Sequence, residues 1–186
     1  MKVQSAILLS LALLACSVEP VSEESEQQGG ALSETDTPVA PADLLNFAAP
    51  EGWTEVEPTG PMRLKQFTLG DDKENEVDVC VAYWKGGIGG LQRNLIRWKE
   101  QIGTGEGTPE PTIDTFTENG LISTLLDGES AFTGMDGSTS TGTRLMAAYI
   151  ESPSGRFDGV FTVKLTVPSA ASAQWADSFR KFVQDL

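Results

Sequence analysis

Histidine is absent from the 186-residue chain, and cysteine occurs only at positions 16 and 80. Without histidine the chain can form no Ser-His-Asp triad, no Cys-His nucleophile and no histidine-ligated metal site. Cys80 has no base near it in the sequence and falls inside a strand pattern. We therefore interpret it as a small buried apolar side chain and not as a nucleophile. The sequence predicts no catalytic residue, no enzymatic activity and no cofactor.

Basic residues are also scarce, because 13 lysines and arginines stand against 27 aspartates and glutamates, for a net charge of −14. A chain this acidic repels nucleic acid and anionic lipid headgroups, so we expect no nucleic-acid partner. Its many carboxylates leave one enzymatic alternative, a hydrolase that uses two close carboxylates, although no particular pair is indicated. The acidic stretch 71–76 lacks the spacing of a calcium loop, and we interpret it as a polar hairpin tip. No metal site is predicted.

No apolar run is long enough to span a membrane. The longest, from Ala6 to Ala15, has the length and position of an export signal. It ends in Leu13-Leu14-Ala15-Cys16, which resembles the lipobox of bacterial lipoproteins.

The lipobox resemblance implies that residues 1–15 are removed, that the thiol of Cys16 receives diacylglycerol, and that the new amine receives a fatty acid such as palmitate. The alternative is an ordinary cleaved signal that leaves Cys16 free. Ser17 follows the cysteine in place of the aspartate that holds enteric lipoproteins at the inner membrane. We therefore expect the periplasmic face of the outer membrane. With Cys16 acylated, Cys80 has no partner for a disulfide within the chain.

Residues 16–45 lack aromatic side chains and basic residues, and seven acidic residues lie between positions 17 and 43. Such a segment cannot bury enough apolar surface to offset the entropy of ordering. We expect a disordered linker that holds a domain of residues 46–186 away from the membrane.

The domain is predicted to be α+β, with an antiparallel sheet of six or seven strands flanked by two amphipathic helices. Alternation of apolar and polar residues predicts strands from residue 53 to the break at Pro58 and at 62–69, 77–84, 113–116, 121–126, 143–150 and 160–167. Asn119-Gly120 predicts a tight hairpin between the fourth and fifth strands. Residues 127–142 are rich in glycine, serine and threonine, and we expect a long loop there.

Two apolar stripes with helical spacing predict the helices. The first comprises Leu91, Leu95, Trp98 and Ile102, with Gly103 ending the helix. The second comprises Trp175, Phe179, Phe182 and Leu186, with Ser169 or Ser172 as the N-terminal cap.

Four glycines, Gly86, Gly87, Gly89 and Gly90, precede the first helix. Their spacing fits neither dinucleotide-binding nor Walker patterns, so a structural hinge is favoured over an anion cradle.

Several short patterns recur together in uncharacterised bacterial secreted proteins and lipoproteins. They are Gly52-Trp53, Met62-Arg63 with Phe67, Gly86-Gly87 with Asn94, Arg97-Trp98 and Gln101, and Val163-Lys164-Leu165 before a Phe-x-x-Phe-Val helix end. The domains of these families are similar to the PsbP-like fold. The resemblance implies a sheet flanked by helices and relatives that act as accessory or assembly proteins. It implies no catalytic residues.

The candidate binding residues are Arg93, Asn94 and Arg97, which follow the glycine hinge in an otherwise acidic protein. Arginine binds carboxylate or phosphate through two parallel hydrogen bonds. The alternative is a solvent-facing helix side with local ion pairs. We predict a membrane-anchored lipoprotein whose domain binds a protein partner in the envelope or a small ligand as an accessory factor. A purely structural envelope protein is the remaining alternative.

Overall fold

The computed structural model describes residues 39–70, 77–103, 108–133, 137 and 139–186. Cys16, the predicted signal and most of the predicted linker lie outside these residues, as does the acidic stretch 71–76. The described chain begins beside a short 3-10 helix, η1 (Pro41–Asp43), and two residues just after it, Leu45 and Phe47, are buried in the core.

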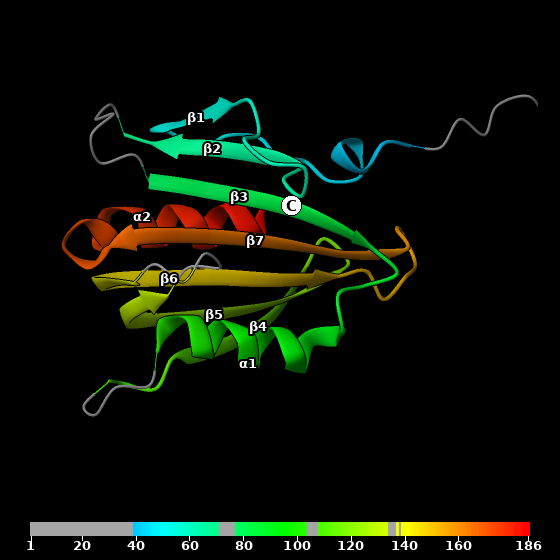
Figure 1. Cartoon of the computed structure of the whole chain (residues 1–186). Coiled ribbons are helices and arrows are strands. Elements are labelled where there is room, and N and C mark those ends of the chain that lie inside the picture. The colour runs from blue at the N-terminus through cyan, green and yellow to red at the C-terminus, as the bar shows by residue number, and fades with distance from the viewer. Residues whose placement is uncertain (1–38, 71–76, 104–107, 134–136, 138) are drawn as a thin grey trace, which may run out of the picture. The chain divides into compact units, whose positions relative to one another are not determined.

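The described strands form one seven-stranded antiparallel sheet in the order β1-β2-β3-β7-β6-β5-β4 (Figure 1). The strands are β1 (Trp53–Val56), β2 (Lys65–Leu69), β3 (Val77–Lys85), β4 (Thr112–Glu118), β5 (Leu121–Thr133), β6 (Thr139–Glu151) and β7 (Gly159–Pro168). With two α-helices packed against the sheet, the predicted α+β class is confirmed. The central strand, β7, is the one whose sequence alternates most regularly between apolar and polar residues.

The two helices cover opposite faces of the sheet (Figure 1). Helix α1 (Gly90–Ile102) packs on β5 and β6 through Leu95, Trp98 and Ile102, which confirms the predicted stripe. Helix α2 (Ser169–Gln184) packs on the other face, where Phe179 and Phe182 join the larger core cluster. None of the helices in the described part of the chain is long and apolar enough to cross a membrane.

Helix α1 lies mainly over β5 and β6, and Val160 of β7 and Trp84 of β3 also join the apolar cluster that it covers (Figure 1). On β3 and β7 the side chains that face the α1 side are mixed, with Trp84 and Val160 as an apolar pair at one end and more polar pairs after it. The more polar pairs are Asp78 with Thr166, Cys80 with Lys164, and Ala82 with Thr162. On the α2 side the same strands contribute fully buried valines, leucine and phenylalanine to the core. The predicted alternation of β7 is therefore confirmed.

The prediction of a loop over residues 127–142 was wrong for most of that range. Residues 127–130 continue β5 and pair with residues 143–146 of β6, and the ladder resumes at Phe132 with Ser140 after an irregularity. Threonine and serine occur in loops and in strands alike, so their abundance did not distinguish the two. Gly128 belongs to the strand because a side chain there would collide with Ile102 and Pro111.

Two further predictions need correction. The second strand begins at Lys65 and not at residue 62, because a turn precedes it in which the Arg63 amide donates to the Gly60 carbonyl. No serine side chain caps α2. Pro168 occupies the cap position, and the Ser172 hydroxyl donates to the Ser169 carbonyl within the first turn.

The tight turns follow the predictions. Asn119 and Gly120 both have positive φ, 53° and 77°, as a two-residue hairpin of this kind requires. Gly103 ends α1 with a φ of 81°.

Candidate functional site

The glycine hinge before α1 is held from inside by one side chain, that of Asn94. Its amide nitrogen donates to the Ile88 carbonyl at 2.9 Å and to the Gly90 carbonyl at 2.8 Å. Asn94 is only 1% exposed, so these bonds are sheltered from water. All four hinge glycines have positive φ, which explains their residue type without a ligand.

The two candidate arginines extend from this braced hinge. The guanidinium of Arg97 donates to the Asn94 side-chain oxygen, so Asn94 fixes both the hinge and Arg97. Arg93 folds back along the loop, and its Cδ lies 3.2 Å from where a Cβ on Gly89 would be. Both arginines are exposed. The structure therefore places Asn94 in a bracing position, with Arg93 and Arg97 at the surface. Their role in binding stays a prediction.

A third cation, Lys164, lies on the face of the sheet that α1 covers. It stands in the middle of β7, opposite Cys80 on β3, and its ammonium donates to the Gln101 side-chain oxygen of α1 at 2.9 Å. Burial lowers the pKa of Lys164 to about 8. Within that value, the charge of Cys80 opposes the effect of burial, and Arg97 and Arg63 make smaller contributions that lower the pKa. Lys164 therefore lies in a partly dry environment with two other cations close by.

A fourth cation, Arg63, lies across β3 from Lys164 and forms an ion pair with Asp78. The turn that carries Arg63 is itself attached to this side of the sheet, because the backbone and hydroxyl of Thr59 donate to the Gln66 side-chain oxygen. We use the name Lys164 cluster for Arg63, Asp78, Cys80, Arg97, Gln101 and Lys164. Two of its members come from β3, two from α1, one from β7 and one from the segment before β2.

Cys80 lies opposite Lys164 and is half-buried, whereas we expected a small buried apolar side chain. Burial raises the pKa of its thiol. The charge of Arg63 opposes this increase, Asp78 adds to it by a smaller amount, and Lys164 opposes it least. The thiol therefore stays protonated at neutral pH, and it is a poor nucleophile in this position.

The half-buried carboxylates of Asp78 and Asp127 do not meet. Asp78 faces the α1 side, whereas Asp127 faces the α2 side, where both of its oxygens accept hydrogen bonds of 2.7 Å from Arg144. These two carboxylates cannot flank one bond, so they do not supply the pair that a hydrolase would need. The described residues contain no group of three histidine, cysteine or acidic side chains that could hold a metal ion.

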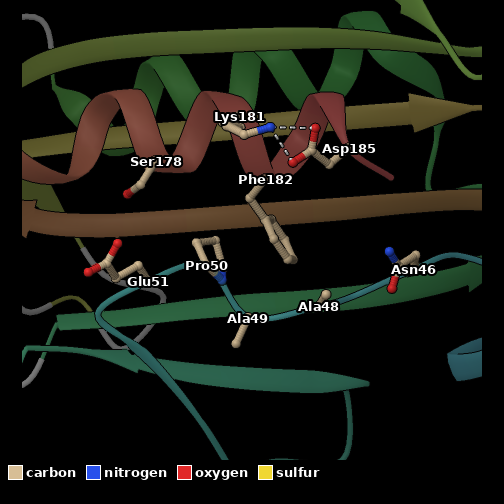
Figure 2. A pocket seen from close by; sticks show the side chains of 9 residues that line it. All are labelled: Asn46, Ala48, Ala49, Pro50, Glu51, Ser178, Lys181, Phe182 and Asp185. Atoms are coloured by element: carbon tan, nitrogen blue, oxygen red, sulfur yellow. Dashed lines mark hydrogen bonds and ion pairs between the residues drawn. The ribbon is translucent and has the colours of Figure 1, made fainter.

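A groove of about 440 Å³ lies elsewhere, between the segment from Asn46 to Glu51 and the end of α2 (Figure 2). Its charged lining residues are Glu51, Lys181 and Asp185, and the last two form an ion pair of 2.7 Å with each other. Phe182 points from α2 toward the crossing segment and belongs to the core (Figure 2). This groove offers an ion pair that is already satisfied, whereas the Lys164 cluster gathers three cations.

The sequence indicated Arg97 but missed Arg63, Asp78 and Lys164. Arg97 was visible because Asn94 and the glycines are its neighbours along the chain. The available signal for Lys164 was a charged residue between two threonines in an otherwise apolar strand. Its proximity to Arg97 and Arg63 depends on which strands pair and where α1 lies.

No protein-family model and no curated protein matches the chain. Among solved structures, the chain is similar to LpqN of Mycobacterium tuberculosis, a protein described as involved in cell envelope biogenesis. The two share 12% identity with a TM-score of 0.45, over 75% of this chain and 79% of LpqN. A likeness of this extent transfers no function.

Proposed function

We propose that the protein is an exported lipoprotein, anchored through acylated Cys16 at the periplasmic face of the outer membrane. Its PsbP-like domain acts there as a non-catalytic accessory factor that captures an anionic group of an envelope protein. The anchor is supported by Leu13-Leu14-Ala15-Cys16 at the end of a short apolar run near the start of the chain. Two or three acyl chains bind a membrane stably even when the protein is acidic.

The position of Arg97 supports the proposed binding role. Its guanidinium is positioned by Asn94, which is itself locked to the hinge, so little side-chain entropy is lost when Arg97 binds. It lies one turn before Gln101, which accepts a hydrogen bond from Lys164. Cations gathered on one face of a protein of charge −14 favour an anionic partner at that face and disfavour contact elsewhere.

The anchor is tested by expressing the full chain with Cys16→Ser in a diderm bacterial host and fractionating the cells. We expect the wild type in the outer-membrane fraction, with an intact mass that includes diacylglycerol and a fatty acid. The variant should lose both the acyl mass and the membrane fraction. Cys80→Ser is the matched control and should behave as the wild type. A wild-type protein without acyl mass would overturn the anchor.

The partner is tested by crosslinking in intact cells, followed by native mass spectrometry of the gently extracted protein. We expect a discrete adduct that Arg97→Ala reduces by about tenfold, as the loss of one charge-assisted contact predicts. Arg156→Ala removes the same charge from an exposed turn and should leave the adduct unchanged. Equal loss in both variants, or a loss that follows a fall in Tm, would remove Arg97 from the binding site.

A further inference from the structure

Strand β4 forms one edge of the sheet, and its outer side is open. It pairs with β5 from Thr112 to Glu118 without a register shift, and no strand that the structure describes lies beyond it (Figure 1). All of its residues except the half-buried Phe116 are exposed. The helices leave it open as well, because both pack mainly on the strands further into the sheet. Such an edge offers unpaired backbone N–H and C=O groups to another strand.

The hairpin turn determines which backbone groups of β4 are free. A two-residue turn is closed by a hydrogen-bonded pair, here Glu118 with Leu121, and bonded pairs then recur at every second residue. The N–H and C=O groups of Ile113, Thr115 and Thr117 therefore point away from β5. An added antiparallel strand opposite these three residues would form about six backbone hydrogen bonds.

The two edges of the sheet differ in how they are protected. At the other edge, β1 has only four residues, and Pro58 follows it closely. A short strand and a proline are common protections against pairing with another chain. Strand β4 has seven residues and contains no proline, lysine or arginine. Its only charged side chains are those of Asp114 and Glu118.

These two acidic side chains determine which strand can pair with β4. They face the α2 side, because Asp114 accepts a hydrogen bond of 2.6 Å from Arg180 of α2 and Glu118 lies four residues further along the strand. Glu118 is exposed and has no ion-pair partner in the part of the chain that the structure describes.

The same acids disfavour a second copy of this chain as the added strand. If two β4 strands paired antiparallel about Thr115, Asp114 of one copy would lie diagonally across from Glu118 of the other. Two chains with a net charge of −14 also repel each other as a whole. A strand that carries basic residues at these positions reverses both effects.

We propose that the free edge of β4 binds an extended, cationic segment of a partner protein as an additional antiparallel strand. Backbone hydrogen bonds to Ile113, Thr115 and Thr117 supply the pairing, and basic residues opposite Asp114 and Glu118 supply the selectivity. Because cross-strand neighbours alternate between the two faces, the basic residues stand four positions apart with an apolar residue midway, opposite Phe116. This surface is additional to the proposed function and does not involve Arg97.

The probe is a labelled peptide, Lys-Thr-Val-Thr-Lys-Val-Thr, with both ends blocked, whose lysines would lie opposite Glu118 and Asp114. Fluorescence anisotropy measures its binding to the full chain in detergent at pH 7 and low salt. We expect saturable binding that weakens at least about tenfold when glutamates replace both lysines, because two attractive cross-strand pairs become repulsive. Equal binding of the two peptides would overturn the inference.

Methylation of single peptide nitrogens tests the backbone pairing. N-methylation of the fourth peptide residue, opposite Thr115, removes a hydrogen-bond donor to β4 and should weaken binding at least about tenfold. The N–H of the third residue points away from β4, so its methylation should change the affinity by less than about threefold. Equal effects at the two positions would show that the peptide does not bind as a strand.

Two variants of the protein locate the surface. Thr115→Pro removes an outward N–H that β5 does not use, so the fold should tolerate it while peptide binding falls at least about tenfold. Thr115→Ser keeps the backbone donor and should bind as the wild type does. Glu118→Gln should weaken binding about threefold, whereas Glu57→Gln, an exposed glutamate near the opposite edge, should not change it.

Hydrogen exchange in the wild type requires no variant and decides the location even where a substitution impairs folding. The peptide should slow exchange of the Ile113, Thr115 and Thr117 amides at least about tenfold, whereas the Asp114 and Phe116 amides, which bond to β5, should be slow with or without it. Absence of saturable binding, or protection elsewhere in the sheet, would overturn the inference. A dimer of the peptide-free chain that Thr115→Pro dissociates would put a second copy at β4 and overturn it too.

Discussion

At the scale of single residues, Gly128 shows how closely α1 approaches the sheet. A Cβ at this position would lie 2.6 Å from Ile102 Cδ1 and 2.9 Å from the Pro111 ring. Ile102 is 1% exposed and has no room to move aside. We expect Gly128→Ala to destabilise the fold by about 1–3 kcal/mol through overpacking.

The free energy of unfolding, measured with urea, checks this prediction. Gly60→Ala is the control, because a Cβ there meets nothing within 4 Å. If both variants unfold at the same urea concentration as the wild type, the close approach of α1 to β5 is wrong.

Lys164 predicts a pH dependence whose sign follows from its lowered pKa. The folded protein releases the lysine proton near pH 8, whereas the unfolded chain keeps it until about 10.5. Between these values the unfolded state binds more protons, so the free energy of unfolding rises with pH. Relative to Lys164→Met, the wild type should therefore gain stability from pH 8 to about 10.5 and show a constant difference below pH 7.

Urea denaturation at several pH values between 6 and 10.5 measures this difference. Burial raises the pKa of the Cys80 thiol, which lies opposite Lys164, and the charges of Arg63, Arg97 and Asp78 also act on these two groups. Both proteins therefore carry Cys80→Ala, which removes the thiol from the comparison. A difference that stays flat with pH would show that Lys164 is solvated in the folded state.

At the scale of elements, the ion pair of Asp127 and Arg144 connects the β5–β6 hairpin to α2. Arg144 donates two hydrogen bonds of 2.7 Å to Asp127 and reaches the Ser172 hydroxyl in the first turn of α2. The Asp127 and Arg144 side chains are 18% and 23% exposed. Removing one partner leaves the other charge partly buried, so each of Asp127→Ala and Arg144→Ala should cost about 1–3 kcal/mol.

A double-mutant cycle isolates the pair. The double variant should cost less than the sum of the two single variants, with a coupling of about 1 kcal/mol or more. Lys65 and Glu55, which form an ion pair on β2 and β1 with the glutamate 47% exposed, provide the control cycle. Their coupling should stay below about 1 kcal/mol. Equal couplings would mean that the partial burial of Asp127 and Arg144 has no energetic effect.

Short sequence patterns predicted the two helices and the hairpin, because these elements depend on residues that are close together in the chain. Each helix follows from an apolar stripe with a period of 3.6 residues, and the Asn119-Gly120 hairpin from the positive φ that both positions need. The extension of β5 and β6 was missed because Gly128, Ser130 and Thr143 fit a loop as well as a strand. Only packing against Ile102 explains why glycine stands at position 128.

The candidate site likewise contains local contacts, which the sequence could predict, and long-range contacts, which it could not. Arg97 and Asn94 lie three residues apart on one helix, so their contact is local and could be predicted. Lys164 meets Gln101 across 63 positions of sequence, and Arg63 meets Asp78 across 15. These contacts require the order of strands in the sheet and the position of α1 over it. No pattern within one segment contains that information.

At the scale of the whole molecule, the excess of negative charge sets the response to salt. A net charge of −14 destabilises the compact state through self-repulsion, and salt screens this repulsion over a distance of about 8–10 Å at physiological ionic strength. The exposed ion pairs change little on screening, since each contributes less than about 1 kcal/mol. We therefore expect sodium chloride to raise Tm, by roughly 2–4 °C for each kcal/mol of repulsion removed.

Calorimetric Tm values between 10 mM and 500 mM sodium chloride test the prediction, with most of the rise expected below about 200 mM, where the screening length changes most. A Tm that falls with sodium chloride would mean that ion pairs outweigh self-repulsion.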